Sequence, residues 1–323
     1  MNKLKVVFMG TPEFAARILA ALLETDAEVA AVFTQPDKPV GRKQTLTPPP
    51  VKVLAEEKGI PVYQPRHVKY PKWVGILNEI RPDLILVAAF GQILSQEILD
   101  IPRFGCVNLH GSLLPQYRGA APAQWAIANG EKRTGITAMQ MDAGMDTGDM
   151  LFSFAADIEK TDTAASLLEK LSVIGAAMVP SIVELLSAGG SFVRTPQDAA
   201  RATYAPILKK EDGLVDWGSS AEAIDCRLRG FTPWPGAYSF LEGAKVDFLE
   251  TAVSEVSTDA LPGTVLEDYL AGKHPRLLIA AGSGVLEVLR LQPQGRKAMR
   301  AEDYLRGADL RGKRFETPAA DAE

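Results

Sequence analysis

Hydrophobic runs of five or six residues alternate with amphipathic stretches through the first half of the chain. Residues 5–9 and 84–89 have the length and composition of buried strands, whereas residues 14–23 repeat apolar side chains at helical spacing. Strands that alternate with helices at this pace predict parallel βαβ units, and hence an α/β fold. Further strands are expected at 28–33, near Val62 and at 106–109, 134–141 and 150–154, and further helices at 51–58, 70–80, 121–129 and 163–186.

The pattern changes beyond residue 209. Strand-like pieces follow one another there without long helices between them, which predicts a small β-barrel. These pieces are residues 237–241, 246–255, 263–267, 277–280 and 285–291, and a helix is expected before them at 221–229. We therefore predict a Rossmann-like domain with a parallel-rich sheet at 1–190, a linker at 191–208 and a barrel domain at 209–323.

The composition is that of a globular protein able to bury a core, with 46% hydrophobic and 23% charged residues among 323. Cys106 and Cys226 lie far apart and lack the spacing of metal ligands, so we expect neither a disulfide nor a metal site. The chain starts with a strand-like run rather than a signal peptide, and no apolar run reaches about 18 residues. We expect a cytoplasmic monomer that does not span a membrane.

Polar side chains of catalytic types are concentrated between residues 106 and 151. Asn108 and His110 stand two apart in a predicted strand, so both side chains project from one face. Asp146 follows after one helix and one strand, in a loop rich in glycine. An amide, an imidazole and a carboxylate can thus converge where the strands end, which is the usual ligand crevice of an open parallel sheet.

These residue types suit the transfer of an acyl group between nitrogen atoms. The reaction passes through a tetrahedral species with a negatively charged oxygen, to which an Asn amide or a protonated His can donate. An imidazole moves protons near neutral pH, and a carboxylate can hold it cationic. No Ser or Cys nucleophile is required if the acceptor amine attacks directly. A lone His at a strand end is more often structural, but Asn108 and Asp146 reverse that expectation for His110.

The run Asn108-x-His110-x-Ser112-Leu-Leu-Pro115-x-Tyr-Arg-Gly119, together with Asp146, resembles the signature of the 10-formyltetrahydrofolate-dependent formyltransferases. The opening Phe8-Met-Gly-Thr-Pro-Glu-Phe14 and the later Trp217 and Phe231-Thr-Pro-Trp-Pro-Gly236 are similar to members that formylate methionyl initiator tRNA. The resemblance covers nearly the whole chain. It implies that the first domain carries the chemistry and that the second is an OB-like barrel that helps to hold the tRNA.

The resemblance also implies roles for single residues. Asn108 would donate to the developing oxyanion, His110 would stabilise it and move protons, and Asp146 would keep His110 charged and position a water or the amine. The strand exit after residue 110 and two loops would bind the folate, although that exit could simply be a turn. The expected folate residues are Phe90, Gly91, Ile93, Ser112, Leu113, Leu114, Pro115 and Asp142.

Positive charge gathers locally in a chain whose net charge is -5. Residues 34–50 hold several turn formers and no periodicity, which predicts a long surface loop whose cations could be merely solvated. The resemblance implies instead that this loop enters the acceptor-stem end of the tRNA, and that cations of the second domain contact the RNA backbone. The residues expected to contact tRNA are Lys38, Arg42, Lys43, Lys209, Lys210, Arg296 and Lys297.

The resemblance thus implies that the chain transfers a formyl group from 10-formyltetrahydrofolate to the α-amine of methionyl initiator tRNA. One alternative keeps the chemistry and changes the acceptor to an amino-sugar nucleotide or to glycinamide ribonucleotide, although the latter would not need a C-terminal barrel. A non-catalytic tRNA-binding protein with a retained folate pocket is a second alternative. Hydrolysis of formylfolate by water is a third.

Overall fold

The computed structural model describes residues 3–41, 44–270 and 274–316. The chain divides into two compact units, and neither is continuous in sequence. The first unit comprises Met1–Pro122, Arg133–Asp157 and Leu167–Pro206. The second unit comprises Ala123–Lys132, Ile158–Ser166 and Ile207–Glu323. Two short segments that precede residue 167 therefore belong to the same unit as the C-terminal part.

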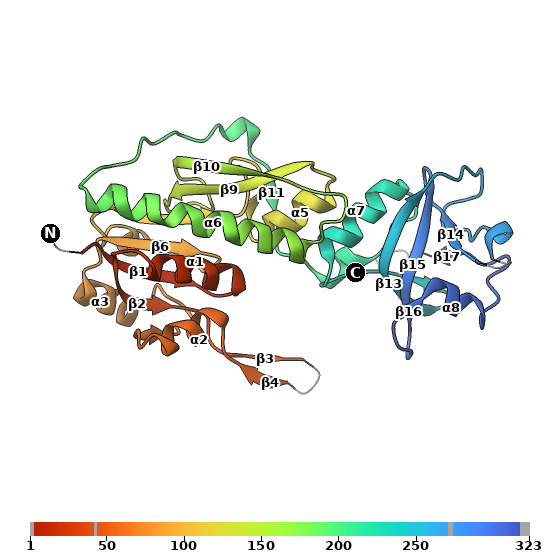
Figure 1. Cartoon of the computed structure of the whole chain (residues 1–323), viewed down its shortest axis with the longest axis horizontal. Helices are drawn as coiled ribbons and strands as arrows, with labels where there is room; N and C mark the ends of the chain where they lie inside the picture. The colour runs from red at the N-terminus through yellow and green to blue at the C-terminus, as the bar shows by residue number, and fades with distance from the viewer. Residues whose placement is uncertain (1–2, 42–43, 271–273, 317–323) are drawn as a thin grey trace. The chain divides into compact units, whose positions relative to one another are not determined.

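A mostly parallel sheet forms the centre of the first unit (Figure 1). Its strands are β1 (Lys5–Gly10), β2 (Glu28–Phe33), β5 (Val62–Tyr63), β6 (Leu84–Ala88), β7 (Cys106–His110), β9 (Arg133–Gln140) and β10 (Met150–Asp157). Within the described residues these strands lie in the order β10-β9-β7-β6-β1-β2-β5. β5, β2, β1, β6 and β7 pair in parallel, whereas β9 and β10 pair antiparallel to their neighbours. The predicted parallel-rich sheet is confirmed.

Helices cover this sheet because each carries an apolar face. α1 (Glu13–Leu23) buries Ile18, Leu19 and Leu22 at helical spacing, and it contacts β1 and β6. α2 (Pro50–Glu57) begins with a proline, which suits a first helical turn, and it contacts β2 and β5. The other helices that start in this part of the chain are α3 (Pro71–Ile80), α4 (Gln96–Leu99), α5 (Pro122–Ala128) and α6 (Ala164–Ser187).

Helix α6 runs for 24 residues and contains Pro180. By length and composition alone it is apolar enough to cross a membrane, a test that core helices also pass, and 44% of its most apolar window is buried in the protein. Its Gly175 faces α1, where an added Cβ would come within 3.1 Å of Ile18 Cδ1. The helix therefore packs closely on α1.

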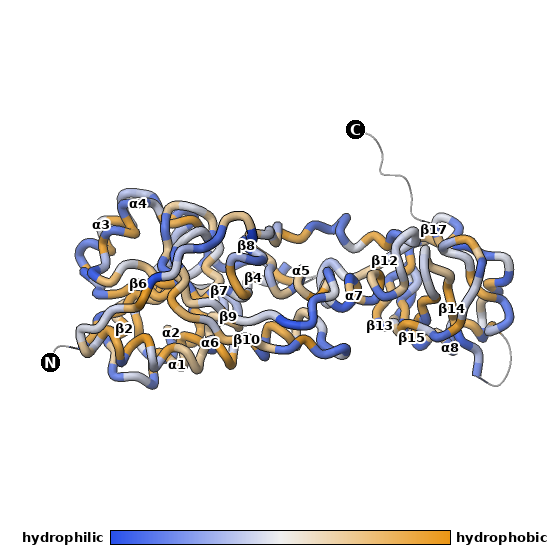
Figure 2. Tube along the Cα trace, turned by 90° about the horizontal axis from the view of Figure 1, so that it is seen from above, coloured by the Kyte–Doolittle hydropathy of each residue, from blue (hydrophilic) through white to orange (hydrophobic). Residues whose placement is uncertain are grey.

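The core of the first unit is built on β1 and its two neighbours, β2 and β6. Val7 and Met9 of β1, Phe33 of β2 and Ile85 of β6 are fully buried in one apolar cluster. The run Leu84–Ala88 is orange in the hydropathy colouring of Figure 2. Burying one such side chain contributes about 1.5–3 kcal/mol, so these strands form a stable platform that fixes the positions of their ends.

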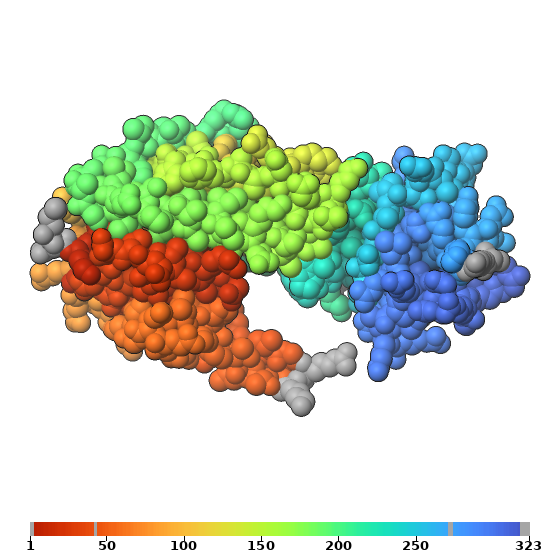
Figure 3. All heavy atoms as spheres, in the orientation of Figure 1, coloured from red at the N-terminus to blue at the C-terminus, as the bar shows by residue number. Residues whose placement is uncertain are grey.

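The segment 34–50 differs from the long surface loop that its composition predicted. It contains a short antiparallel hairpin of β3 (Lys38–Val40) and β4 (Thr45–Thr47), which projects from the first unit in Figures 1 and 3. Asp37 anchors the base of the hairpin by accepting hydrogen bonds from Lys52 Nζ at 2.9 Å and from Gln64 Nε2 at 2.7 Å. Both strands are exposed on both faces, so no hydrophobic alternation marks them in the sequence.

Residues 191–206, which we call the connector, are bound along the first unit. Thr195 forms a bridge with Met150 at the start of β10. Further on, η1 (Ala199–Arg201) is followed by β11 (Tyr204–Ala205), which pairs in parallel with β8 (Arg118–Gly119). Gly119 permits this close approach, since a Cβ there would lie 2.6 Å from the carbonyl oxygen of Ala205.

The second unit is built on a curled antiparallel sheet. Its strands are β12 (Ala237–Leu241), β13 (Ala244–Ser254), β14 (Leu277–Ala280), β15 (Val285–Pro293), β16 (Met299–Arg300) and β17 (Phe315–Glu316). The path runs β14-β15-β13-β12-β17, with β16 paired to β15. Thr264 bridges to Arg314 beside β17, and Val265 bridges to Ile279 of β14. The predicted piece 263–267 thus joins the two edges of the sheet, and the predicted OB-like barrel is confirmed.

Trp217 lies at the centre of the barrel core. Its ring contacts Phe248 and Phe315, with each pair of ring centroids 5.8 Å apart, and its Nε1 donates to Ser239 Oγ at 2.9 Å. The core therefore satisfies the single polar atom of the indole. The short helices of this unit are α8 (Ala301–Leu305), η2 (Lys210–Gly213) and η3 (Glu267–Tyr269).

Helix α7 (Ala221–Phe231) also belongs to the second unit and packs on the part of α5 assigned to that unit. The rings of Trp125 and Phe231 meet edge to face, with centroids 5.3 Å apart. At Gly230 an added Cβ would lie 2.6 Å from the carbonyl oxygen of Gln124, so only glycine fits there. The segment 123–132 is therefore part of the packing of the second unit.

Candidate active site

Strand β7 carries Asn108 and His110 toward the carboxyl end of the parallel sheet. The chain passes from β1 to β2 and β5 on one side and then returns to β6 and β7 on the other, so the order of strands switches between β1 and β6. Ligands of open parallel sheets bind outside the carboxyl ends of the strands at such a switch. β7 is the neighbour of β6, and His110 is its last residue, so the pair lies beside this position.

The two ring nitrogens of His110 each face an acceptor. Nε2 lies 2.9 Å from the carbonyl oxygen of Tyr117, which can only accept, so this nitrogen donates. Nδ1 lies 3.7 Å from Asp146 Oδ2. The side chain of His110 is only 6% exposed and that of Asp146 only 16%. The imidazole is therefore oriented by the Tyr117 carbonyl oxygen and turns Nδ1 toward the Asp146 carboxylate.

Asp146 stands in a loop after β9 and adopts a left-handed backbone with φ of 54°. Aspartate is among the few residues that tolerate this conformation. Its Oδ2 accepts a hydrogen bond from the backbone N–H of Gly119 at 2.8 Å. Gly148 allows the loop to turn back, since a Cβ there would lie 1.8 Å from the carbonyl oxygen of Gln140. The structure thus brings Asp146 to His110 from a separate segment of the chain.

Asn108 presents a polar group that the described part of the protein does not use. The residue is 9% exposed, and none of the described residues forms a hydrogen bond with its side chain. A buried amide ordinarily has a partner, because leaving it unpaired costs about 1–3 kcal/mol. Its amide is therefore available to a ligand that enters beside His110.

The predicted folate segment 112–115 forms a tight exit from β7. The Ser112 hydroxyl is buried and donates to the carbonyl oxygen of Gln116 at 2.6 Å, so it serves the loop itself. Thr137 of β9 ties the loop down, donating to the carbonyl oxygen of Ser112 and accepting from the N–H of Leu114. Leu114 and Pro115 are joined by a cis peptide bond and are buried, whereas Leu113 is partly exposed.

The other predicted folate residues come from two different loops. Phe90 is buried after β6, and its carbonyl oxygen accepts from Gln35 Nε2 at 3.0 Å. Gly91 is exposed and Ile93 is 72% exposed, which leaves an apolar side chain facing solvent beside the strand ends. Asp142 is exposed and folds its own loop, with Oδ1 accepting from the Gly144 N–H and from Thr147 Oγ1.

The predicted tRNA residues are spread over both units. Lys38 is exposed on β3 of the hairpin, while Arg42 and Lys43 lie outside the described residues. In the second unit, Lys209 and Lys210 are exposed around the start of η2. Arg296 and Lys297 are exposed between β15 and β16.

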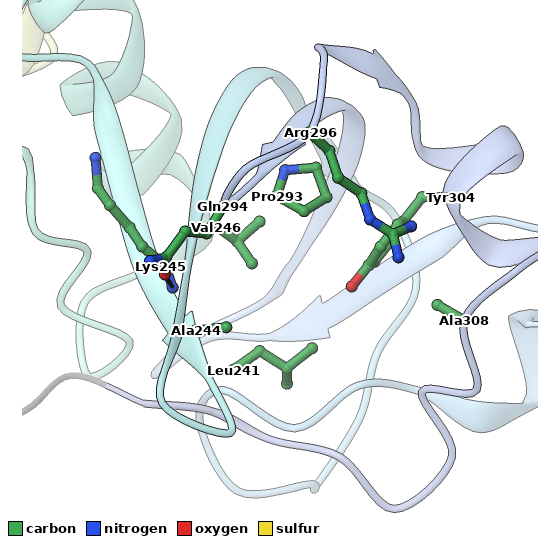
Figure 4. Close-up of a pocket in the computed structure, with 9 residues that line it drawn as sticks. All are labelled: Leu241, Ala244, Lys245, Val246, Pro293, Gln294, Arg296, Tyr304 and Ala308. Atoms are coloured by element: carbon green, nitrogen blue, oxygen red, sulfur yellow. Dashed lines mark hydrogen bonds between the residues drawn. The ribbon is translucent and has the colours of Figure 1, made fainter.

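A small pocket of the barrel adjoins Arg296. Figure 4 shows its side chain reaching toward Tyr304, whereas the side chain of Lys245 is directed away from both. Lys245 is already engaged, since it contacts Asp247 at 2.5 Å and lies over the ring of Tyr238. Arg296 is thus the cation of this pocket that remains open to a ligand.

Three residues that were not among the predicted site residues support His110 and Asp146. Tyr117 supplies the carbonyl oxygen for His110, and its own N–H donates to Thr203 Oγ1 at 2.9 Å. Gln197 donates from Nε2 to the carbonyl oxygens of Asp146 and Gly148, at 2.8 and 2.7 Å. Gln197 and Thr203 lie in the connector, whose composition is that of a linker, so no signal singled them out.

Cys106 lies on β7 two residues before Asn108 and is fully buried. Burial raises the pKa of its thiol to about 12. A thiol in this state is protonated at neutral pH and is a poor nucleophile. Among the described residues, no group of three or more His, Cys, Asp or Glu side chains is placed to hold a metal ion.

Comparison with known proteins identifies the family of the chain. The formyl transferase family model matches residues 3–183, and the model of the formyl transferase C-terminal domain matches residues 207–309. The chain belongs to the formyltransferase family. The predicted resemblance is confirmed, and both family segments are present.

Two relatives within the formyltransferase family are both methionyl-tRNA formyltransferases. A methionyl-tRNA formyltransferase from Geobacter metallireducens is 49% identical over 310 residues, which is 96% of this chain and 97% of that protein. A methionyl-tRNA formyltransferase from Desulfotalea psychrophila is 47% identical over 309 residues, covering 96% of this chain and 94% of that protein. The similarity therefore extends over both units.

Solved structures of other formyltransferases share the fold. The sugar 3N-formyl transferase WlaRD, crystallised with dTDP and 5-N-formyl-THF, superposes with a TM-score of 0.64 at 18% identity, over 92% of this chain and all of that chain. HypX from Aquifex aeolicus in complex with tetrahydrofolic acid gives a TM-score of 0.60 at 18% identity, over 94% of this chain and 47% of that chain. At this identity the likeness concerns the fold alone.

Proposed function

We propose that the protein transfers a formyl group from 10-formyltetrahydrofolate to the α-amino group of methionyl initiator tRNA, in the cytoplasm. The observation that carries the proposal is the contact between His110 and Asp146, beside an Asn108 amide that no described residue engages. This set occurs in a chain that is 49% identical to a methionyl-tRNA formyltransferase over nearly its full length. The residue types and the relatives point to the same reaction.

The three residues act on one carbonyl carbon. The neutral amine of the methionyl group attacks the formyl carbon, a C–N bond forms, and the formyl oxygen becomes an oxyanion. The Asn108 amide donates to that oxygen, and the cationic ring of His110 places positive charge beside it, which together lower the barrier. Asp146 takes the proton that the attacking nitrogen loses, directly or through a water. The bond to N10 of the folate then breaks, and that nitrogen takes up a proton.

The folate would lie against the loops that follow β6 and β7. Ile93 and Leu113 offer apolar surface there, and main-chain groups of the exposed Gly91 and of the Asp142 loop remain at the strand ends. Apolar walls with a few backbone donors and acceptors suit a flat heterocycle. Ser112 shapes the pocket from within, because its hydroxyl is bonded inside its own loop.

The tRNA surface of the second unit follows from which cations lack a partner among the described residues. Several arginines are neutralised by carboxylates: Arg276 pairs with Glu287, Arg306 with Glu302 and Asp303, and Arg311 with Asp309. Four exposed cations around the β15–β16 turn form no ion pair with any described residue: Arg290, Arg296, Lys297 and Arg300. Arg290 stands opposite Arg300 on β16 and opposite Glu250 on β13, so the four cations of this turn leave an excess of positive charge that favours an anionic partner. We assign the RNA backbone to this surface.

A competition between acceptors tests the proposal. The protein is incubated with formyl-labelled 10-formyltetrahydrofolate and an equimolar mixture of methionyl initiator tRNA, glycinamide ribonucleotide and a dTDP-amino sugar. Label is expected in formylmethionyl-tRNA. Label in one of the small acceptors would assign the chain to another acceptor class, and release of formate alone would indicate hydrolysis.

A further inference from the structure

We propose that Gln197 and Thr203, both in the connector, are positioning residues that hold Asp146 and His110 in register for the reaction. The proposal rests on the proposed function for its kinetic consequences, although its structural part does not. Each residue reaches one member of the pair through a separate backbone contact. The connector would thus form part of the active site rather than a passive link between units.

Gln197 clamps the backbone immediately after the Asp146 side chain. Its Nε2 supplies both amide hydrogens to carbonyl oxygens, one of Asp146 itself at 2.8 Å and one of Gly148 at 2.7 Å. The loop 142–149 has no regular secondary structure, and Asp146 adopts a left-handed conformation within it. A non-glycine residue in a sparsely populated conformation persists only where its surroundings hold it. Gln197 provides that restraint from outside the loop.

Arg118 fixes which way the Gln197 amide points. Arg118 is only 5% exposed, and its guanidinium donates from Nε at 3.0 Å and from Nη2 at 2.8 Å to Gln197 Oε1. Since an arginine can only donate, Oε1 must face it, and Nε2 must face the two carbonyl oxygens. The amide therefore has a single orientation that satisfies all of its partners.

Thr203 holds the other member of the pair through Tyr117. Its Oγ1 accepts from the N–H of Tyr117 at 2.9 Å, and its carbonyl oxygen accepts from the N–H of Arg118 at 2.9 Å. Tyr117 has a left-handed backbone with φ of 58°, and its carbonyl oxygen receives the hydrogen bond from His110 Nε2. A shift of Tyr117 would therefore move the acceptor that orients the imidazole.

The two contacts act on one distance. His110 Nδ1 and Asp146 Oδ2 are 3.7 Å apart, and they are contributed by a strand and a loop that the chain joins only through 35 intervening residues. The connector contacts the backbone that holds Asp146 and the backbone that holds His110, so it fixes the position of one residue relative to the other. Misplacing catalytic groups by about 1 Å can reduce a rate by about a hundredfold.

Near-isosteric replacements test each contact. Gln197→Met keeps the length of the side chain and removes its hydrogen bonds, and Thr203→Val keeps the shape and removes the hydroxyl. Each is expected to lower kcat by about ten- to a hundredfold with KM for the folate within about twofold, because positioning is lost and binding is retained. Thr203→Ser restores the hydroxyl and should recover most of the activity. Ile18→Val, in the core of α1, loses comparable stability and should keep kcat.

A double-mutant cycle separates positioning from general destabilisation. If Gln197 acts through Asp146, then Gln197→Met should cost less than about threefold in the Asp146→Asn background. If Gln197→Met lowered kcat by the same factor in the Asp146→Asn background as in wild type, the proposal would be overturned. Values of kcat near wild type in both single variants would also overturn it.

Amide hydrogen exchange of the free protein provides a readout that does not depend on the acceptor. Gln197→Met should accelerate exchange in peptides covering 142–149, with peptides from β12 and β13 unchanged. Unchanged exchange in the 142–149 loop would overturn the clamp. If wild type formylated no acceptor, the proposed function would fail, and the exchange result would still decide the clamp.

Discussion

Replacing Asp146 with Asn removes one negative charge from the pair and changes little else in shape. Oδ2 lies 3.7 Å from His110 Nδ1, and both side chains are largely shielded from water. With an effective dielectric constant of about 20, two unit charges at that separation attract by about 4.5 kcal/mol. Part of this is lost to screening and relaxation, so we expect a penalty of about 3–4 kcal/mol in the transition state, or about 150- to 900-fold in kcat.

The assay is the steady-state formation of formylmethionyl-tRNA, with the folate concentration varied to give kcat and KM. KM for the folate should stay close to wild type, because the charge acts on the reacting centre rather than on the pterin. Asp157→Asn is the matched control, since Asp157 forms an exposed ion pair with Arg133 on the same unit and such pairs contribute little. We expect its kcat to equal that of wild type.

The result that refutes this reasoning is a folded Asp146→Asn protein within about threefold of wild-type kcat. It would mean that the carboxylate neither charges the imidazole nor accepts the proton of the amine. A rise in KM alone would likewise place Asp146 in binding rather than in chemistry.

Three further predictions concern other parts of the molecule. Arg300→Gln should weaken tRNA binding and reduce the steepness of the salt dependence, measured as log of the binding constant against log of the salt concentration, by about one. Arg306→Gln removes an arginine that is already paired with carboxylates, so it should change neither the affinity nor the slope. Equal slopes for the two variants would contradict the assignment. Cys106 should resist iodoacetamide at pH 8 until denaturant unfolds the chain, because its pKa of about 12 keeps the thiol protonated; mass spectrometry of the native protein would reveal the opposite. Asp37→Asn should loosen the base of the hairpin and reduce kcat/KM for tRNA by about three- to tenfold with no effect on folate KM, and an unchanged value for tRNA would remove the hairpin from recognition.

The candidate site was foreseeable where chemistry and local periodicity coincide. Asn108 and His110 are two residues apart in a strand, and this alone places both on one face of β7. Alternation of strands and helices predicts a parallel sheet, whose strand ends form the crevice. The residue types suggested a contact between His110 and Asp146. The position of the Asp146 carboxylate depends on a left-handed backbone conformation in a loop, and no periodicity in the sequence specifies such a conformation.

Features that depend on long-range contacts escaped the sequence patterns. The hairpin of β3 and β4 is exposed on both faces, so burial leaves no mark on its residues. The cluster of cations after residue 294 looked uniform, yet several find carboxylates that only the fold brings near, as Lys313 finds Glu242. Gln197 reaches the Asp146 loop through backbone carbonyl oxygens, which every residue type provides. No composition or spacing can signal such a partner.

The interleaving of the two units bears on how the protein can be taken apart. A fragment that stops at Pro206 would retain α5 but lose α7, and the indole of Trp125 would be stripped of Phe231. A fragment that starts at Ile207 would lack α5, so the surface of α7 at Gly230, against which α5 packs, would be uncovered. Half-molecules cut at the obvious place are therefore expected to aggregate, and a split version would have to carry residues 123–132 across with the C-terminal piece.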